Sequence, residues 1–395
     1  MNVDPVVIIG ASRTPLGGFG GDLAALSAPE LGSVAISDAI TKSGIEITDV
    51  NEVIMGVVLP AGQGQAPARQ ASIGAGIPKA VGATTINKMC GSGMKAAMLA
   101  HDNILSGAHE IMVAGGMESM SNAPYLLPDA RSGIRMGHGQ LKDHMFIDGL
   151  EDAYDSGTLM GVYAENTAEA YQFTRDAQDE FAITSLKRAS SAAEKKKFSD
   201  EIVPITVQSR KAETVIKNDE QPRNARPEKI PELRPAFREH GTVTAANSSS
   251  ISDGAAALIL VRRSEAEKQG LTPLAAIHGH ATHAQDPEWF TTAPIEAINK
   301  VLAKASWNKD EVDLFEINEA FAVVTMAAMK DLGLSHDKVN VHGGACALGH
   351  PVGATGARII VTLLNSLSRY DLKKGVASLC IGGGEATAIA IEKLN

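Results

Sequence analysis

Short apolar runs alternate with helical stretches along the first part of the chain and predict an α/β fold. Val6-Val7-Ile8-Ile9 is typical of a buried strand, and Val53 to Leu59 predicts a second one. Between and after them, residues 28–42 and the stretch around 68–74 favour helices. Because strands alternate with helices, we expect a mostly parallel sheet.

The same order of elements occurs in both halves of the chain, which indicates a weak internal repeat. Each half has a turn, a helix rich in small residues, a buried strand and a glycine-rich closure. In the first half these are Cys90-Gly91-Ser92-Gly93, residues 94–106, residues 110–114 and Gly115-Gly116-Met117-Glu118. In the second half they are Gly349-His350-Pro351, residues 353–367, residues 376–380 and Gly382-Gly383-Gly384. Cys90 and His350 therefore hold the same place, each at the opening of a helix.

The stretch from about 121 to 247 interrupts this repeat and predicts an inserted loop domain. Phe173, Ala177, Phe181 and Leu186 are spaced near the helical period, so residues 164–197 predict an amphipathic helix. From Lys187 to His240 the chain has thirteen Lys and Arg against nine Asp and Glu, within a protein of net charge −10. This basic segment suggests an anionic ligand, although a solvated helical surface is the commoner explanation.

Composition narrows the class of protein. A length of 395 residues corresponds to two or three domains of roughly 150 residues. With 44% hydrophobic and 21% charged residues the chain is expected to be globular. The longest apolar run, Ala255 to Val261, is too short to span a membrane, which takes roughly 18 residues. The acidic net charge argues against a nucleic-acid partner. No secretory signal is visible, and the three cysteines predict no disulfide framework, so we expect a cytoplasmic protein.

Cys90 and His350 are the first candidates for chemistry. A helix N-terminus lowers the pKa of a thiol, which would make Cys90 a nucleophile, although a lone cysteine is more often a buried structural residue. Pro351 suits the first turn of a helix, so His350 is expected at its N-cap. A neutral imidazole there could accept the proton of Cys90. A merely packed or capping histidine is the alternative.

Three further residues have a possible role. Cys380 ends an apolar strand and could act as acid and base, or be a core cysteine. Asn318 could hold a water molecule or donate to a carbonyl, or cap a helix. Cys346 is interpreted as packing. The candidates are too far apart in the chain for the usual zinc spacing, so we expect no metal. No dinucleotide fingerprint follows the first strand, so nicotinamide binding is not expected either.

Taken together, these segments resemble the thiolase family from about Val6 to the end of the chain. The matching motifs are Asn87-Lys88-Met89-Cys90-Gly91-Ser92-Gly93, Gly115 to Ser121, Asn318-Glu319-Ala320-Phe321-Ala322, Gly349-His350-Pro351 and Cys380-Ile381-Gly382-Gly383-Gly384. The resemblance implies a five-layered αβαβα fold of two similar halves with an inserted loop domain, often assembled as a homotetramer. We expect residues 1–120 with 248–270 as the N-terminal half, 121–247 as the loop domain and 271–395 as the C-terminal half.

The resemblance also implies the reaction, a reversible ping-pong Claisen condensation of two acetyl-CoA to acetoacetyl-CoA and CoA. Cys90 would carry the acyl group, and Cys380 would move the α-proton. One oxyanion hole would use His350 and a water held by Asn318, and the other the N–H groups of Cys90 and Gly382. CoA is a substrate and product here, so no cofactor is expected.

By the same resemblance, Met160, Ala320 and Phe321 would line the acyl pocket, and Ser249 would lie near the pantetheine. Arg223 and Lys229 are candidates for the phosphates of CoA. One departure is Leu159, where many acetoacetyl-CoA-forming thiolases have histidine. A broader 3-ketoacyl-CoA thiolase of fatty-acid β-oxidation is therefore the main alternative. A decarboxylating ketoacyl synthase and a non-catalytic CoA- or lipid-binding protein are disfavoured, because the former lacks the second catalytic cysteine and both thiols and the histidine are present here.

Overall fold

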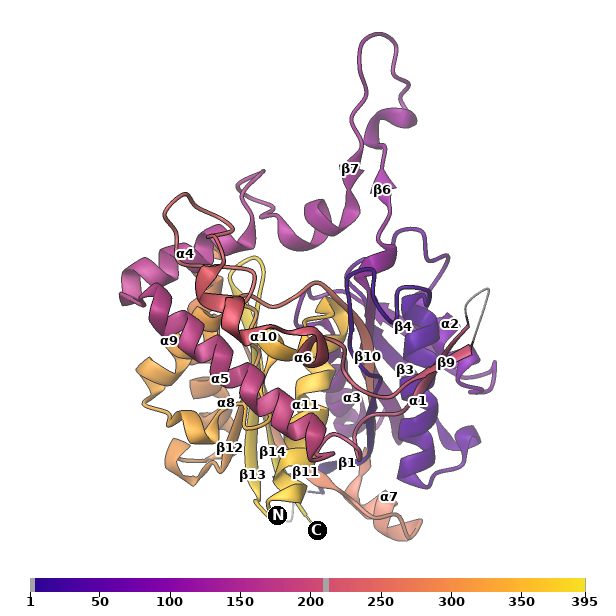
Figure 1. The fold of residues 1–395 in the computed structure, drawn as a ribbon. Helices are drawn as coiled ribbons and strands as arrows, with labels where there is room; N and C mark the ends of the chain where they lie inside the picture. The colour runs from indigo at the N-terminus through magenta and orange to yellow at the C-terminus, as the bar shows by residue number, and fades with distance from the viewer. Residues whose placement is uncertain (1–3, 209–212, 395) are drawn as a thin grey trace.

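The structure is a computed structural model that describes residues 4–208 and 213–394 (Figure 1). The strands of its main sheet follow the order β12-β13-β14-β11-β1-β10-β5-β3-β4. The N-terminal part of this sheet comprises β1 (Val6–Arg13), β3 (Glu52–Gly56), β4 (Gly82–Ile86), β5 (Ile111–Ser119) and β10 (Ser252–Arg262), with β2 (Gly17–Gly18) paired to β10. The C-terminal part comprises β11 (Ala275–Ala284), β12 (Leu314–Ile317), β13 (Lys374–Ile381) and β14 (Glu385–Lys393).

The expectation of a mostly parallel sheet is wrong, because the sheet is mixed. Only β3–β4, β3–β5 and β12–β13 pair in parallel, and the other named pairs in it are antiparallel. β14 follows β13 through the short turn at 382–384, and a turn that short can join only antiparallel strands. β10 in turn returns beside β5 after the inserted segment.

Among the described residues, the two parts of the sheet meet where β1 pairs with β11, over Val7–Ala276 and Ile8–Ala275. Helices α1 (Ala28–Ser43) and α2 (Pro67–Gly74) cover the outer face of the N-terminal part, and α8 (Ala293–Ala305) and α9 (Ala322–Leu332) that of the C-terminal part. Helices α3 (Ser92–Ser106) and α11 (Val352–Arg369) lie between the inner faces. This is the expected five-layered order.

Alternation along single strands assigns side chains to these layers. On β14, Ile389 and Ile391 belong to the core around α3 and α11, whereas Ala386, Ala388 and Ala390 belong to the core under α8 and α9. The alanines admit the helices closely, and the isoleucines fill the wider central layer. The chain thus buries both faces of the strand.

Two predicted boundaries in the N-terminal half are wrong. The strand expected to reach Leu59 ends at Gly56, and β5 runs through the residues expected to close it. A Cβ on Gly115 would lie 2.2 Å from the carbonyl oxygen of Ala256, and one on Gly116 would lie 2.0 Å from that of Gly353. These glycines therefore permit close backbone approach within a strand, and they do not mark a turn.

The inserted segment forms two helices where one was expected. Helix α4 (Met160–Tyr171) ends at Gln172, whose φ of 56° is left-handed, and α5 (Arg175–Glu194) begins after Thr174. The Thr174 hydroxyl accepts a hydrogen bond from the Ala177 N–H, and this cap makes a new helix start more favourable than a continued one. The sequence did not indicate this break, because apolar residues keep the helical spacing across Phe173.

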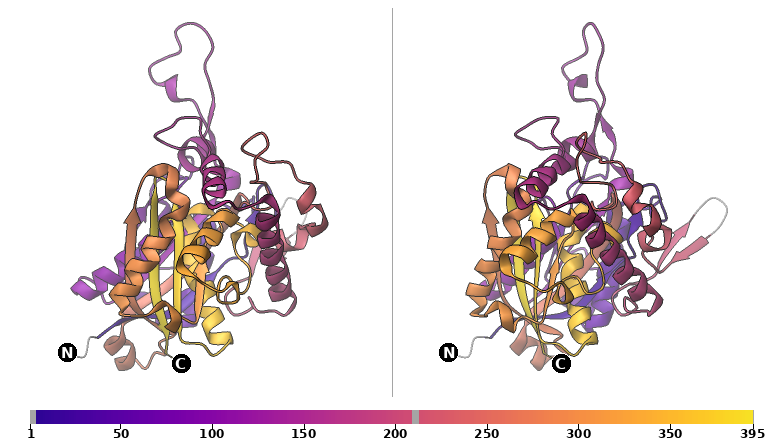
Figure 2. Two further views of the ribbon diagram at one scale, coloured as in Figure 1. Left: turned by 90° about the vertical axis from the view of Figure 1, so that its left-hand side faces the viewer. Right: turned by 60° about the vertical axis from the view of Figure 1, so that its left-hand side comes forward.

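The remaining elements lie around this layered body. A hairpin of β6 (Tyr125–Leu126) and β7 (Lys142–Asp143) projects away from it (Figures 1 and 2). The others are β8 (Ile205–Gln208), β9 (Glu213–Ile216), α6 (Gln221–Asn224), α7 (Arg263–Lys268) and α10 (Ala345–Leu348). Arg210 and Lys211 of the basic segment lie outside the described residues. Within the described ranges, no helix has the length and apolar character needed to cross a membrane.

Candidate active site

A cavity of about 380 Å³ lies where the two halves and the inserted segment meet. Most of its wall is apolar and comes from Phe146, Leu150, Phe237, Phe290 and Val352. Seven of the candidate site residues also line it, namely Cys90, Met160, Ser249, Ala320, Phe321, His350 and Gly382, and so does Leu159. Residues from distant parts of the chain therefore share one apolar chamber.

The crossing of α3 and α11 places Cys90 and His350 at this cavity. Each residue directly precedes the N-cap of its helix, Gly91 for α3 and Pro351 for α11, so the expectation that His350 is itself the N-cap is wrong by one position. The helices approach closely because a Cβ on Gly356 would lie 2.3 Å from the Met94 nitrogen. Glycine there permits the contact that brings the two helix starts together.

Burial governs the acidity of Cys90. It raises the pKa of the thiol to about 11, and the negative charge of Glu118 contributes in the same direction. The N–H groups of Gly382 and of Cys90 itself are directed at the sulfur and oppose this rise. The helix start was expected to lower the pKa, but Cys90 lies ahead of the N-cap and desolvation is the larger effect. The resting thiol is therefore protonated and needs a base.

His350 presents an unprotonated ring nitrogen to the same cavity, although its low pKa makes it a weak base in the resting protein. Burial, followed by the charge of Arg358, lowers the pKa of its imidazole to about 3, so the ring is neutral. Its Nδ1 lies 2.6 Å from the Thr355 hydroxyl oxygen. Its Nε2 is buried and has no hydrogen-bond partner among the described residues. An unpaired ring nitrogen beside the cavity can serve a reacting group.

Thr355 allows the imidazole to act in two ways. Its hydroxyl oxygen lies 3.0 Å from the Pro351 carbonyl, to which it can donate. It then accepts from the Nδ1–H of His350 and leaves a lone pair on Nε2. If the hydroxyl donates to Nδ1 instead, Nε2 carries the hydrogen and becomes a donor. One rotating hydroxyl can therefore support both a base and an oxyanion donor.

Cys380 and Asn318 lie behind the cavity wall. Cys380 is fully buried near the end of β13 and packs in one apolar cluster with Ala320 and Phe321. Burial raises the pKa of its thiol, and a negative charge on Cys90 raises it further. The Asn318 N–H donates to the Ser378 carbonyl at 3.0 Å. Both side-chain polar atoms of Asn318 are buried without a partner among the described residues.

Sequence profiles of two domains account for nearly the whole chain. The profile of the thiolase N-terminal domain matches residues 6–264, and that of the thiolase C-terminal domain matches residues 271–393. The chain belongs to the thiolase family.

Individual thiolases are similar to this chain over their whole lengths. Acetyl-CoA acetyltransferase from Cupriavidus necator is 50% identical over 390 residues, which are 98% of this chain and 99% of the relative. A crystal structure of the Bacillus anthracis acetyl-CoA acetyltransferase has a TM-score of 0.96 at 44% identity, with 99% of each chain covered. A thiolase from Ascaris suum, solved in complex with coenzyme A, has a TM-score of 0.93 at 43% identity, with 99% of this chain and 100% of that chain covered.

Glu118 is a residue of this thiolase whose role the sequence analysis missed. Burial raises the pKa of its carboxyl group to about 7. The carboxylate accepts hydrogen bonds from the N–H groups of Val58 (2.9 Å), Leu59 (3.1 Å) and Gly353 (2.8 Å). Glu118 thus ties the end of β3 to the start of α11. An acid within a buried, glycine-rich strand was the available signal.

The candidates for CoA phosphates lie in different surroundings. Lys229 lines a cavity of about 320 Å³ that shares Ala245 and Ser250 with the chamber of Cys90. Arg223 does not line it, and its half-exposed guanidinium pairs with Asp22. The structure therefore brings Lys229, but not Arg223, next to the candidate site.

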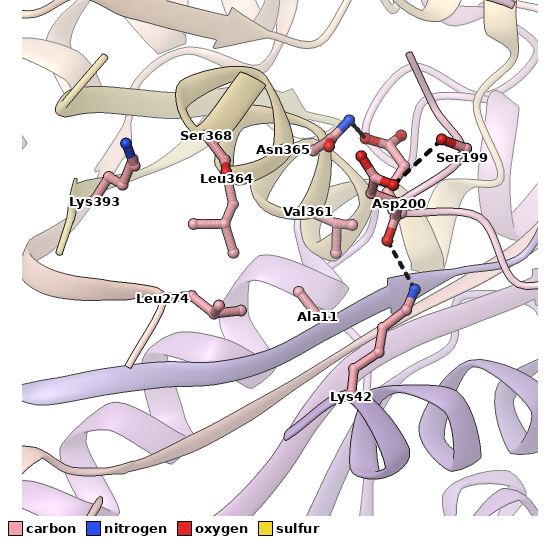
Figure 3. Close-up of a pocket in the computed structure, with 11 residues that line it drawn as sticks. Ala11, Lys42, Ser199, Asp200, Leu274, Val361, Leu364, Asn365, Ser368 and Lys393 are labelled. Carbon is pink, nitrogen blue, oxygen red and sulfur yellow. Dashed lines mark hydrogen bonds between the residues drawn. The ribbon is translucent and has the colours of Figure 1, made fainter. Parts of the chain in front are cut away.

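A larger cavity of about 700 Å³ lies towards the other end of α11 (Figure 3). Its lining includes Lys42, Asp200, Val361 and Lys393. The Lys42 ammonium donates to the Asp200 carbonyl oxygen at 2.9 Å. None of the residues singled out by the sequence contributes to this lining, so cavity size does not locate the chemistry in this thiolase.

Proposed function

We propose that this thiolase is an acetyl-CoA C-acetyltransferase, which condenses two acetyl-CoA reversibly to acetoacetyl-CoA and CoA. The observation that supports it best is the meeting of Cys90, His350 and the Gly382 N–H at one apolar chamber, with Cys380 directly behind. CoA takes part as substrate and product, and we propose no cofactor.

The first half-reaction forms an acetyl thioester on Cys90. His350 Nε2 takes the proton of the thiol, and the sulfur attacks the carbonyl carbon of acetyl-CoA. The carbon–sulfur bond to CoA then breaks, and Cys380 donates its proton to the departing CoA sulfur. His350 is now an imidazolium and Cys380 a thiolate. Because both sites are buried, the two opposite charges stabilise each other more than they would in water.

The second half-reaction forms the carbon–carbon bond. The Cys380 thiolate removes an α-proton from a second acetyl-CoA, and the resulting carbanion attacks the acetyl carbon on Cys90. The bond between that carbon and Cys90 breaks, and the Cys90 thiolate recovers its proton from His350. Every group then returns to its resting protonation state.

Oxygen atoms that gain negative charge need donors aimed at them. The N–H groups of Cys90 and Gly382, which are directed at the sulfur, suit the oxygen of the acetyl group on Cys90. The unpaired polar atoms of His350 and Asn318 suit the thioester oxygen of the second acetyl-CoA, with a water held by Asn318.

The remaining parts of CoA have an available path. We propose that the pantetheine passes Ser249 and Ser250 and enters the neighbouring cavity lined by Arg226 and Lys229. The cations there suit phosphate groups. Arg223 remains a weaker candidate, because Asp22 already neutralises it.

We further propose that the chain works as a homotetramer in the cytoplasm. The projecting β6–β7 region exposes several large apolar side chains, including Tyr125, Leu127, Ile134, Met136 and Leu141. Such a patch is typical of an interaction surface. All three cysteines have free thiols, as a reducing compartment requires. Light scattering of the purified protein measures the subunit number, and a monomeric mass would contradict the tetramer.

A series of 3-ketoacyl-CoA substrates tests the proposed function. We expect the protein to catalyse thiolysis of acetoacetyl-CoA and condensation of acetyl-CoA. The kcat/KM for thiolysis should be at least about tenfold lower for much longer 3-ketoacyl-CoA substrates than for acetoacetyl-CoA. Equal kcat/KM for four-carbon and longer substrates would instead identify a broad 3-ketoacyl-CoA thiolase. Absence of both thiolysis and condensation would refute the proposal.

A further inference from the structure

Three side chains with metal-binding atoms meet where α3 contacts β11, outside the catalytic cavity. His101 and Asp102 are neighbours on α3, and His280 lies on β11. The Asp102 carboxylate oxygen lies 3.1 Å from His101 Nδ1 and 2.8 Å from His280 Nε2. All three of these atoms lie within 4.8 Å of one another. They therefore join the central helix of the N-terminal half to the inner strand of the C-terminal half.

The chemistry of these atoms selects a class of ion. Two imidazoles and one carboxylate favour Zn²⁺ and similar transition metals, whereas Mg²⁺ and Ca²⁺ prefer oxygen ligands alone. Bonds of about 2.0–2.2 Å in a tetrahedral arrangement place ligand atoms about 3.3 Å apart. The two separations from the Asp102 oxygen, 2.8 and 3.1 Å, need to open by a few tenths of an ångström, and the ligand atoms of the two histidines lie within 4.8 Å of each other.

Burial and exposure around the three side chains also suit such an ion. The His280 ring is largely buried, and its Nε2 faces the Asp102 carboxylate. The side chain of Asp102 is 51% exposed, whereas those of His101 and His280 are 11% and 14% exposed. An ion can thus enter past Asp102, and a water molecule can take the fourth position.

One charge near this cluster opposes a cation. The Lys304 ammonium donates to the backbone carbonyl of His280 at 2.9 Å, so a positive charge lies close to this ligand. The positive charge of a bound ion must therefore be balanced by Asp102, the one carboxylate among the three ligands. This dependence makes Asp102 as important to the test as the histidines.

We propose that His101, Asp102 and His280 form a Zn²⁺-binding site that fastens α3 to β11. The ion replaces the hydrogen bonds between the rings and the carboxylate. On each ring the proton then resides on the nitrogen that faces away from the ion. Because α3 begins just after Cys90, the ion holds the helix of the nucleophile against the opposite half. Binding to the folded state alone also stabilises the protein.

Calorimetric titration with ZnCl₂ after treatment with a chelator tests this site. The parent for the titration is Cys90→Ser, so that the catalytic thiol cannot bind the ion. We expect one Zn²⁺ per chain, and affinity at least about tenfold weaker when His280→Gln or Asp102→Asn is added. The matched control is His278→Gln, on the same strand, whose ring contacts the Glu392 carboxylate at 2.7 Å. It should bind Zn²⁺ as the parent does.

Thermal unfolding provides a second measurement on the same four proteins. Zn²⁺ should raise the midpoint of the parent and of His278→Gln, and should leave that of His280→Gln and Asp102→Asn unchanged. Each variant without Zn²⁺ shows whether it folds. Failure of the parent to bind saturably would overturn the proposal. Equal binding by His280→Gln, Asp102→Asn and the parent would also do so.

Discussion

The two halves of the molecule have the same scaffold, but they contribute differently to the cavity. Each places one residue directly before the N-cap of a central helix, Cys90 in the N-terminal half and His350 in the C-terminal half. Burial keeps both neutral, because it raises the pKa of the thiol and lowers that of the imidazole. The same position and the same desolvation thus yield a protonated nucleophile and an unprotonated base.

The strands that enclose these helices differ more. β5 of the N-terminal half carries Glu118, whose carboxylate is fully used in binding three backbone N–H groups. The C-terminal half carries Cys380 near the end of β13, and after that strand the Gly382 N–H, directed at Cys90. The N-terminal half therefore supplies one reacting group and an anchor, and the C-terminal half supplies the groups that move protons and bind charge.

Removing the single reacting group of the N-terminal half should have the largest effect. Cys90→Ser replaces the sulfur with a poorer nucleophile that His350 cannot readily deprotonate. We expect kcat for condensation and thiolysis to fall at least about 10⁴-fold. The thermal midpoint and the Kd for CoA should change little, and they serve as the control. Activity close to that of the unaltered protein would show that Cys90 is not the nucleophile.

Removing the second thiol should separate the two half-reactions. In Cys380→Ser, Cys90 and His350 remain, but the α-proton has no thiolate to receive it. We expect steady-state condensation to fall about 10³-fold. Rapid mixing with acetyl-CoA should still release about one CoA per chain, but more slowly than in the unaltered protein, because CoA can leave as a thiolate without the proton that Cys380 gives it. A variant that condenses at an undiminished rate would place the α-proton on another base.

Altering the partner of the base should have a smaller effect. Thr355→Val removes the hydroxyl that contacts His350 Nδ1, so the ring loses control of which nitrogen carries hydrogen. We expect kcat to fall about tenfold to a hundredfold, with a changed pH profile, as part of what acid–base catalysis supplies. Thr355→Ser retains the hydroxyl and should restore the profile. If serine and valine behave alike, the effect is one of packing.

Altering Glu118, the anchor of the N-terminal half, should have the smallest effect, and the effect should be on the free energy of unfolding. The folded pKa of Glu118 is about 7, above its ordinary 4.5, so the folded state retains the proton as the unfolded state loses it. The stabilisation is complete below pH 4.5 and is lost as the pH rises through 7. Its size is up to about 1.4 kcal/mol per pH unit in that window.

Denaturant unfolding from pH 5 to pH 8 measures how much Glu118 contributes to the pH dependence of the free energy of unfolding. Glu118→Gln carries no proton to lose, so its free energy of unfolding should fall less steeply with pH than that of the unaltered protein. Other buried acids are shared by both proteins and cancel in the comparison. Parallel slopes would mean that Glu118 is not the titrating group.

Single helices and strands followed from the sequence where a local pattern determined them, whereas the five-layered order was expected only from the resemblance to thiolases. Helix α1 occurs at 28–43 against an expected 28–42, with Ser27 capping its start as the local pattern requires. The break at Gln172 was missed because the apolar period continues across it. The parallel sheet was wrongly expected because strand direction depends on which strands return beside one another.

The candidate site was likewise predictable in part from the sequence. The motifs around Cys90, His350 and Cys380 identify residues, and seven of the candidates line one cavity. The sign of the change in the pKa of Cys90 was mistaken, because desolvation depends on neighbours contributed by both halves. Thr355 and Glu118 were missed for the same reason, since their partners are apparent only after folding.

Peptide mapping by mass spectrometry tests the division of work between the halves most directly. Cys380→Ser is incubated with acetyl-CoA, quenched in acid and digested. The account predicts an acetyl group on the peptide that contains Cys90, and none on peptides that contain only Cys346. An acetyl group elsewhere in the chain, or no adduct despite release of CoA, would contradict it.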